Sequence, residues 1–118
     1  MRQVAVVDVT TGDVLAERAE VADTFWTRFL GLQGRRSLPA GSGLVLAPTG
    51  SIHMLFMRFA IDAVFVAGDG RVVRVARGLR PWVSAAFATG ALYCIELPRG
   101  AAGATAAGHR IELRAHEA

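Results

Sequence analysis

Three residues with ionisable side chains, His53, Arg58 and Asp62, lie in the otherwise apolar segment SIHMLFMRFAID, residues 51–62. A carboxylate in such a segment needs a compensating partner, because uncompensated burial raises its pKa or unfolds the site. A guanidinium can supply a planar, two-point contact to a carboxylate. We therefore expect Asp62 to be held either by Arg58 or by backbone N–H groups at the end of a turn.

The same residues could also form a binding site. Arg58 and Asp62 are four positions apart, so they can share a face in a strand or a helix, and His53 joins them if the chain bends between 56 and 61. Arg28 and Arg35 precede this segment and add positive charge. Because an imidazole, a carboxylate and several guanidinium groups suit an anion better than a metal ion, we predict a small-molecule or anion-binding cluster with no metal or cofactor.

Simpler interpretations of these residues remain open. Asp62 and Arg58 can form a structural ion pair, and His53 can be a half-exposed residue without a role. A hydrolase would use His53 as a general base oriented by Asp62, which requires the two side chains to lie within hydrogen-bonding reach. The sequence does not decide whether the protein is an enzyme.

A protein-interaction module or homodimer is a further hypothesis. It predicts an exposed apolar patch around Phe56, Trp82 and Phe87. Binding to nucleic acid is disfavoured, because a net charge of +3 spread over 118 residues is a modest electrostatic signal.

Four other residues are assigned structural roles. Glu96 is expected to share a strand face with Cys94 and to be either solvated or paired with an arginine. The residues with predicted structural roles are Gly34, Gly70, Glu96 and Pro98.

Composition indicates one folded domain over residues 1–118. The chain is 53% hydrophobic and 19% charged, which is enough apolar sequence to bury a core. The first residues do not resemble a signal peptide, and no uncharged segment approaches the ~20 residues of a membrane span. We expect a cytoplasmic protein without a membrane association.

Short strands separated by turns dominate the predicted secondary structure. A helix is expected to begin at Asp23 or Thr24 and to stop near Gly34, and a second short helix is expected in the connection 99–108. The fold class is therefore mainly β, a small antiparallel barrel-like or sandwich domain with one or two short helices. The predicted strands are 2–9, 14–21, 43–48, 51–56, 61–67, 71–77, 91–98 and 109–114, and 80–90 is predicted to be irregular.

Several motifs together resemble a known family. RFLGLQGR at 28–35, SIHMLFMRFAIDAVFV at 51–66, GDGRVVRV at 68–75 and ELPRG at 96–100 occur in the order and spacing of the bacterial and archaeal domain of unknown function 192. The resemblance covers roughly residues 5–114. It implies a compact β-barrel-like domain and marks His53, Arg58 and Asp62 as shared positions, without implying a reaction.

Overall fold

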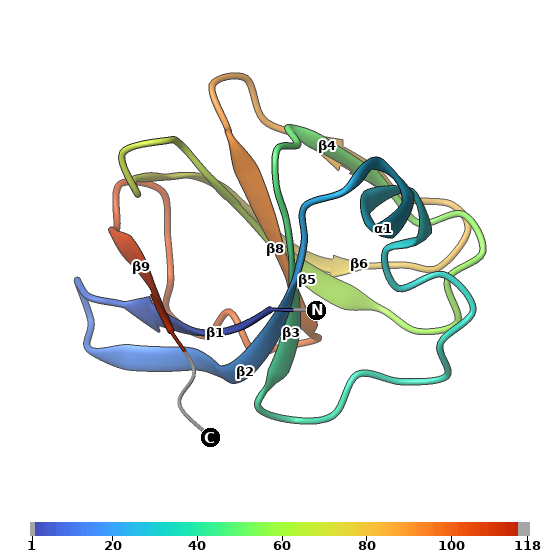
Figure 1. Cartoon of the computed structure of the whole chain (residues 1–118), viewed down its shortest axis with the longest axis horizontal. Coiled ribbons are helices and arrows are strands. Elements are labelled where there is room, and N and C mark those ends of the chain that lie inside the picture. The colour runs from blue at the N-terminus through green and yellow to red at the C-terminus, as the bar shows by residue number, and fades with distance from the viewer. Residues whose placement is uncertain (1, 116–118) are drawn as a thin grey trace.

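The computed structural model (Figure 1) describes residues 2–115, apart from the side chain of Phe25. Along these residues the chain forms nine short strands and one short helix. The elements are β1 Gln3–Asp8, β2 Asp13–Ala22, α1 Phe25–Leu30, β3 Ser42–Leu46, β4 Ser51–His53, β5 Ile61–Val66, β6 Val72–Leu79, β7 Ala85–Phe87, β8 Tyr93–Pro98 and β9 Ile111–Ala115.

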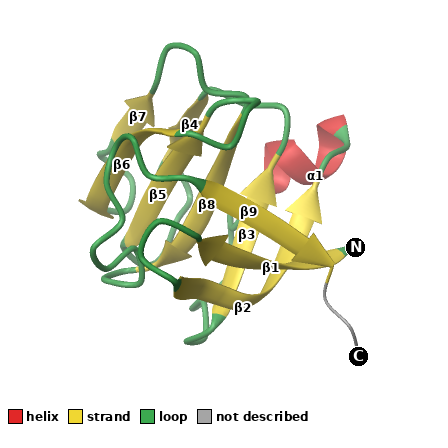
Figure 2. Cartoon of the chain, turned by 90° about the vertical axis from the view of Figure 1, so that its left-hand side faces the viewer, coloured by secondary structure: helices red, strands yellow, loops and turns green. Residues whose placement is uncertain are grey.

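Seven of the strands form one curled sheet in the order β6-β5-β8-β3-β2-β1-β9. Neighbouring strands in it are antiparallel except β2 and β3, which run parallel. The two edges, β6 and β9, approach each other at one end, where Arg71 and Arg110 form an isolated bridge. The sheet is therefore a half-barrel, seen from two sides in Figures 1 and 2, and the predicted mainly β, barrel-like fold is confirmed.

A close backbone approach joins the two edges. The Ile111 N–H donates to the Gly70 carbonyl at 2.7 Å, and the Val72 N–H donates to the His109 carbonyl at 2.8 Å. Gly70 has a φ of +91°, and a Cβ at this position would lie 2.9 Å from the Ile111 carbonyl oxygen. Glycine is therefore needed here both for its conformation and for its lack of a side chain.

A buried polar cluster ties the same end of the half-barrel together. The fully buried carboxylate of Asp8 accepts hydrogen bonds from the Thr105 hydroxyl and from His109 Nδ1, each at 2.8 Å, and from the Thr10 N–H at 3.0 Å. Burial raises the pKa of Asp8, but the hydrogen bonds from His109, Thr105 and the backbone outweigh it and lower this pKa below 3.8. The cluster connects β1 to the segment before β9.

Strand register assigns the residues of β8 to two faces of the sheet. Leu97 lies opposite Asp62 on β5, whereas Glu96 lies opposite Ala63 on β5 and Leu44 on β3. Directly paired residues project to the same face, so Asp62 and Glu96 face opposite sides of the sheet. The face of Leu97 lines the inside of the half-barrel, whose core includes Val6, Val45, Val64, Ile95, Leu97 and Ile111.

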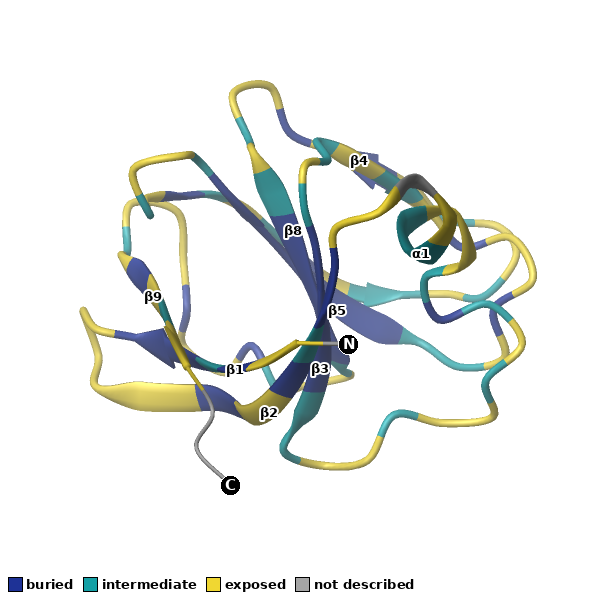
Figure 3. Ribbon diagram, viewed as in Figure 1, coloured by how far each residue is buried: buried dark blue, intermediate teal, exposed yellow. Residues whose placement is uncertain are grey.

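The outer face of the sheet is covered by α1 and the two-stranded β4–β7 sheet. Figure 1 shows α1 and β4 on the same side of the sheet, and the buried segments meet where β3, β5 and β8 cross (Figure 3). Ile52 of β4 packs on two apolar clusters of this face. The larger buried residues of these clusters are Leu32, Leu44, Met54, Ile61 and Phe65.

Two predictions for the covering segments are wrong. The expected strand 51–56 ends at His53, because the chain turns and Phe56 adopts a φ of +63°. The segment expected to be irregular contains β7, whose Ala86 pairs with Ile52. Neither the turn after His53 nor the strand β7 has a regular alternation of apolar and polar residues, so the local sequence pattern could not predict them.

The helix begins where the sequence predicts and ends earlier. Thr24 caps α1 by accepting a hydrogen bond from the Thr27 N–H at 3.1 Å. The helix ends at Leu30, and Gly31, which has a φ of +49°, caps it three residues before the predicted stop at Gly34. The connection 99–108 forms successive turns instead of a second helix. Within residues 2–115, no helix has the length and apolar character needed to cross a membrane.

Candidate functional site

The Asp62 carboxylate is compensated by the backbone. Its Oδ1 accepts from the Gly78 N–H at 2.9 Å, and its Oδ2 accepts from the Gly100 and Ala102 N–H groups at 2.9 and 3.2 Å. The structure thus decides between the two predicted alternatives in favour of backbone donors. Arg58 is exposed and forms no ion pair with any residue among 2–115.

His53 and Asp62 do not form a pair. Asp62 faces the inside of the half-barrel, whereas His53 belongs to β4, which covers the outer face. Both carboxylate oxygens of Asp62 are already engaged by backbone N–H groups. The geometry that a hydrolase with His53 as base and Asp62 as orienting acid requires is therefore absent.

The other two arginines of the predicted cluster, Arg28 and Arg35, are engaged elsewhere. The Arg28 guanidinium donates to the carbonyl oxygens of Asp23 at 2.9 Å and Ala47 at 3.2 Å, which ties α1 to the end of β3. Arg35 forms an ion pair with Glu20 at 3.6 Å. The five residues predicted to bind one ligand together are thus dispersed, and only His53 and Arg28 line the same cavity.

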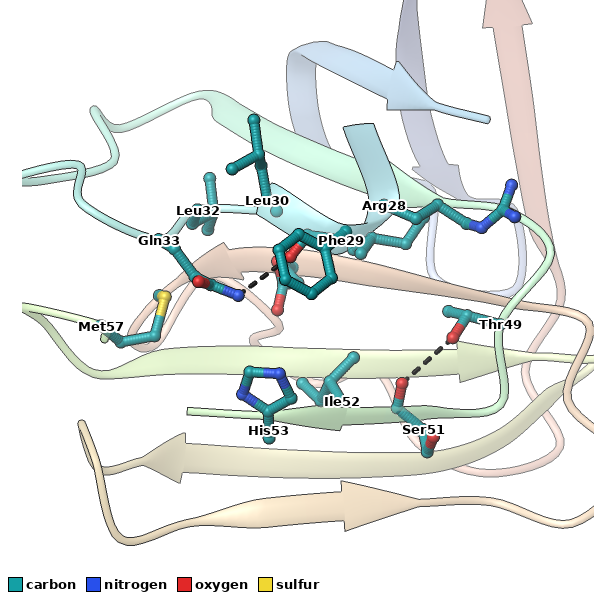
Figure 4. A pocket seen from close by; sticks show the side chains of 13 residues that line it. Arg28, Phe29, Leu30, Leu32, Gln33, Thr49, Ser51, Ile52, His53 and Met57 are labelled. Atoms are coloured by element: carbon teal, nitrogen blue, oxygen red, sulfur yellow. Dashed lines mark hydrogen bonds between the residues drawn. The ribbon is translucent and has the colours of Figure 1, made fainter. Parts of the chain in front are cut away.

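That cavity lies between α1, the segment that follows it, and β4. Its volume is about 90 Å³. Figure 4 shows the His53 ring pointing from β4 into the space below Phe29, and the Arg28 guanidinium directed away from His53. The lining residues also include Leu46 and Glu96 of the large sheet, Gln33, and Thr49 and Ser51 beside β4.

Glu96 is the buried acid of this cavity. It is only 4% exposed, and its carboxylate has no hydrogen bond to any residue that the structure describes. Every fully enclosed side-chain oxygen of the described residues has a hydrogen bond. Because the Glu96 carboxylate has none, it is not fully enclosed, and it reaches solvent through the cavity that it lines. Desolvation raises the pKa of Glu96 to about 7, and the positive charge of Arg35 opposes this effect only in part.

Polar groups on the walls complement the carboxylate. The Leu55 N–H donates to His53 Nδ1 at 3.2 Å, so the neutral imidazole carries its proton on Nε2. The Thr49 hydroxyl donates to the Ser51 carbonyl at 3.0 Å, and the Gln33 side-chain amide donates to the Phe29 carbonyl at 2.9 Å (Figure 4). The cavity thus combines a carboxylate acceptor with an imidazole N–H donor.

Sequence reasoning placed Glu96 among the structural residues and missed its position in the cavity. Its neighbours in CIELP are apolar, and β8 lies between β3 and β5 in the middle of the sheet. An acid in a strand paired on both sides and covered on both faces cannot be solvated in the ordinary way. The apolar neighbours of Glu96 were therefore the one sequence feature that could have indicated a buried acid at this position. Within residues 2–115, no three His, Cys, Asp or Glu side chains gather in a way that could hold a metal ion.

These features define a class of protein: a small half-barrel β domain with an acidic cavity on the outer face of its sheet. The sequence profile of domain of unknown function 192, described as "Uncharacterized ACR", matches residues 6–113. The chain belongs to this family.

Two archaeal relatives support the assignment. A UPF0127 protein of Thermococcus sibiricus is 36% identical over 98 residues, which are 80% of this chain and 63% of the relative. The UPF0127 protein PF1050 of Pyrococcus furiosus is also 36% identical over 98 residues, 79% of this chain and 82% of the relative. The chain thus spans less than two thirds of the Thermococcus protein and most of the Pyrococcus protein.

Two solved structures share the fold. A protein of unknown function from Novosphingobium aromaticivorans is 28% identical with a TM-score of 0.79, over 93% of this chain and 83% of that one. A Sinorhizobium meliloti protein (R01717), described as a proposed transcription regulator, is 20% identical with a TM-score of 0.81, over 95% and 92% of the two chains. At that identity, the second likeness shows the fold alone.

Proposed function

We propose that the protein binds a small polar ligand in the cavity between α1 and β4. The observation that carries this proposal is the Glu96 carboxylate, which is 4% exposed, lacks a hydrogen bond to the described residues and lines this cavity. A carboxylate in this position accepts its hydrogen bonds from molecules that enter the cavity, either water or a ligand. A concave site with apolar walls and a few convergent polar groups is the usual form of a ligand pocket.

The proposal revises the expected charge of the ligand. An anion would need the guanidinium groups of Arg28 and Arg35, but these are engaged with carbonyl oxygens and with Glu20. In the cavity itself the anion would face the Glu96 carboxylate at short range, where like charges repel strongly. The cavity therefore favours ligands that donate hydrogen bonds to a carboxylate.

A ligand screen tests the proposal. Small amines, amides, polyols, carboxylates and phosphates are added in turn to ¹⁵N-labelled protein, and backbone amide shifts are recorded. We expect saturable shifts that cluster on β4 and on the segment from Gly31 to Gln33. Ser51→Phe, at the exposed edge of the cavity, should abolish these shifts, whereas Ser37→Phe, in an exposed loop, should preserve them. A screen without saturable shifts at the cavity refutes the proposal.

A homodimer contact is a second candidate function. The Phe56 and Trp82 rings meet edge to face at a centroid distance of 5.0 Å, although their residues are 57% and 54% exposed. Both residues have positive φ angles, +63° and +70°, which bulky residues adopt only when neighbouring contacts enforce them. Exposed aromatic residues held in a costly conformation favour a contact surface.

Sedimentation equilibrium tests the second candidate. If Phe56 and Trp82 form a homodimer contact, wild-type protein should self-associate as its concentration rises, and Trp82→Ser should shift the equilibrium to monomer. Trp26→Ser changes the other exposed tryptophan, on α1, and should leave the association unchanged. A wild-type protein that stays monomeric up to 0.5 mM excludes the homodimer.

A further inference from the structure

We propose that the cavity selects a small organic cation, an ammonium or guanidinium group with an oxygen acceptor next to it. The inference rests on the proposed function and names the chemical class of its ligand. Glu96 would accept hydrogen bonds from the cationic group, and His53 would donate from Nε2 to the neighbouring oxygen. Both groups line the same cavity from different elements, β8 and β4.

The carboxylate supplies the first half of this recognition. Charged donors on nitrogen make the shortest and strongest hydrogen bonds to a carboxylate, and a partner of opposite charge offsets the cost of holding that carboxylate away from water. No arginine side chain of residues 2–115 donates a hydrogen bond to Glu96, although Arg28 lines the same cavity. The chain thus leaves this carboxylate available for a donor from outside.

The imidazole supplies the second half. Because Nδ1 of His53 already accepts from the Leu55 N–H, the neutral ring has only Nε2–H to offer to the cavity. His53 is exposed, so this N–H can donate to water when no ligand is bound. A ligand that also carries a hydroxyl or carbonyl oxygen accepts a hydrogen bond from this N–H in addition to its contact with Glu96, which adds to its affinity.

The walls and the volume restrict the ligand further. Phe29, Leu30, Ile52 and Met57 line the cavity with apolar atoms, on which the carbon atoms of a ligand can pack. In Figure 4 the Phe29 ring lies above the His53 ring, across the space between α1 and β4, and an aromatic face attracts a cation. The volume of about 90 Å³ corresponds to about three water molecules, so the recognised group has only a few heavy atoms.

The charges around Glu96 are compatible with a bound cation. On α1, Arg28 directs its charge toward the carbonyl oxygens of Asp23 and Ala47. In the following loop, Arg35 is paired with Glu20. On β8 itself, the pKa of Cys94 is raised by burial and by the charge of Glu96, so this thiol stays neutral. Among the described residues that line the cavity, Glu96 is the only acid, so the negative charge at the cavity is that of Glu96.

Three probes of four heavy atoms each test the inference by NMR titration at pH 8. Ethanolamine has both the cation and the oxygen, propylamine lacks the oxygen, and ethylene glycol lacks the cation. Ligands with so few atoms ordinarily bind with dissociation constants of about 1 mM, and NMR titration can measure binding this weak. We expect ethanolamine to bind at least tenfold more tightly than ethylene glycol and severalfold more tightly than propylamine.

Two variants assign these preferences to residues. Glu96→Gln should remove the tenfold preference for ethanolamine over ethylene glycol, and His53→Phe should remove its preference over propylamine. Glu17→Gln makes the same chemical change at an exposed position and should keep both preferences. Each variant is first checked for a wild-type-like NMR spectrum, so that a loss of selectivity is not a loss of fold.

The pH dependence gives a readout that a merely structural role would not produce. With the pKa of Glu96 at about 7, its ionised fraction rises about tenfold between pH 6 and pH 8, whereas the amine stays protonated. Ethanolamine affinity should therefore rise about tenfold more over this range in the wild type than in Glu96→Gln, because the other titrating groups are shared by the two proteins.

The outcomes separate the inference from the proposed function. If ethylene glycol binds the cavity as tightly as ethanolamine, or if only neutral or anionic compounds from the screen bind there, the selection of cations is refuted and ligand binding stands. If no compound of any class produces saturable shifts at the cavity, both proposals fail.

Discussion

The free energy of unfolding should depend on pH through Glu96 in a way that one substitution removes. In the folded protein the pKa of Glu96 is about 7, against 4.5 for an unperturbed side chain. Below pH 4.5 the acid is protonated in both states and imposes no penalty. As pH rises from 4.5 to 7, the unfolded chain loses the proton while the folded protein keeps it, so stability falls and then levels off above the folded pKa.

The difference between these two pKa values corresponds to about 3 kcal/mol in total, of which about 2.5 kcal/mol falls between pH 5 and pH 8. Glu96→Gln has nearly the same shape and no ionisation. Its stability relative to the wild type should therefore increase by about 2.5 kcal/mol from pH 5 to pH 8. The group is almost fully buried, so solvent screening reduces this figure little.

Urea denaturation of both proteins at pH 5, 6, 7 and 8 measures this change. The other titrating groups are shared by the two proteins and cancel in the difference. Glu17→Gln serves as the control, because this exposed glutamate should show a flat difference. If the difference for Glu96→Gln also changes by less than about 0.5 kcal/mol, the carboxylate is solvated or paired, and the reasoning about the acidic cavity is wrong.

Three other perturbations test the structural assignments by the same denaturation assay. Asp62→Asn places an amide among three backbone N–H donors and should cost about 2–3 kcal/mol, whereas a loss below 0.5 kcal/mol would contradict the assigned hydrogen bonds. Gly70→Ala should cost about 3 kcal/mol, because it adds a clash to the unfavourable φ, while Gly12→Ala, with a similar φ and open space, should cost about 1 kcal/mol. Equal losses would disprove the close approach at Gly70. Asp8 has a lowered pKa, so its stabilisation is present above pH 3.8 and is lost as pH falls below that value. The advantage of the wild type over Asp8→Asn should therefore be smaller at pH 3 than at pH 5. An advantage that is unchanged at pH 3 would contradict the hydrogen-bonded carboxylate.

Local patterns in the sequence predicted most of the secondary structure. Alternating apolar residues and glycine turns located the β1–β2 and β5–β6 hairpins, and Asp23 and Thr24 marked the start of α1 to within one residue. These signals are local, because side-chain alternation and capping depend on residues only a few positions apart. For the same reason, the need of Asp62 for compensation could be predicted from its apolar neighbours.

The location of the candidate site depended on contacts between distant segments. Sequence spacing suggested that His53 and Asp62 could meet, but the register of β5 against β8 places Asp62 on the inner face, and β4 covers the outer one. A shift of one residue in register would exchange these faces, and spacing along the chain does not report register.

The sequence by itself determined that this chain forms a mainly β domain and that its buried acids need compensation. The tertiary structure alone decided which acid lacks a protein partner. Strand order places β8 inside the sheet between β5 and β3, and α1 and β4 cover Glu96, while backbone N–H groups of β6 and of the turn after β8 satisfy Asp62. The physical reason is that desolvation of a charge depends on everything packed around it, and most of those neighbours are remote in sequence.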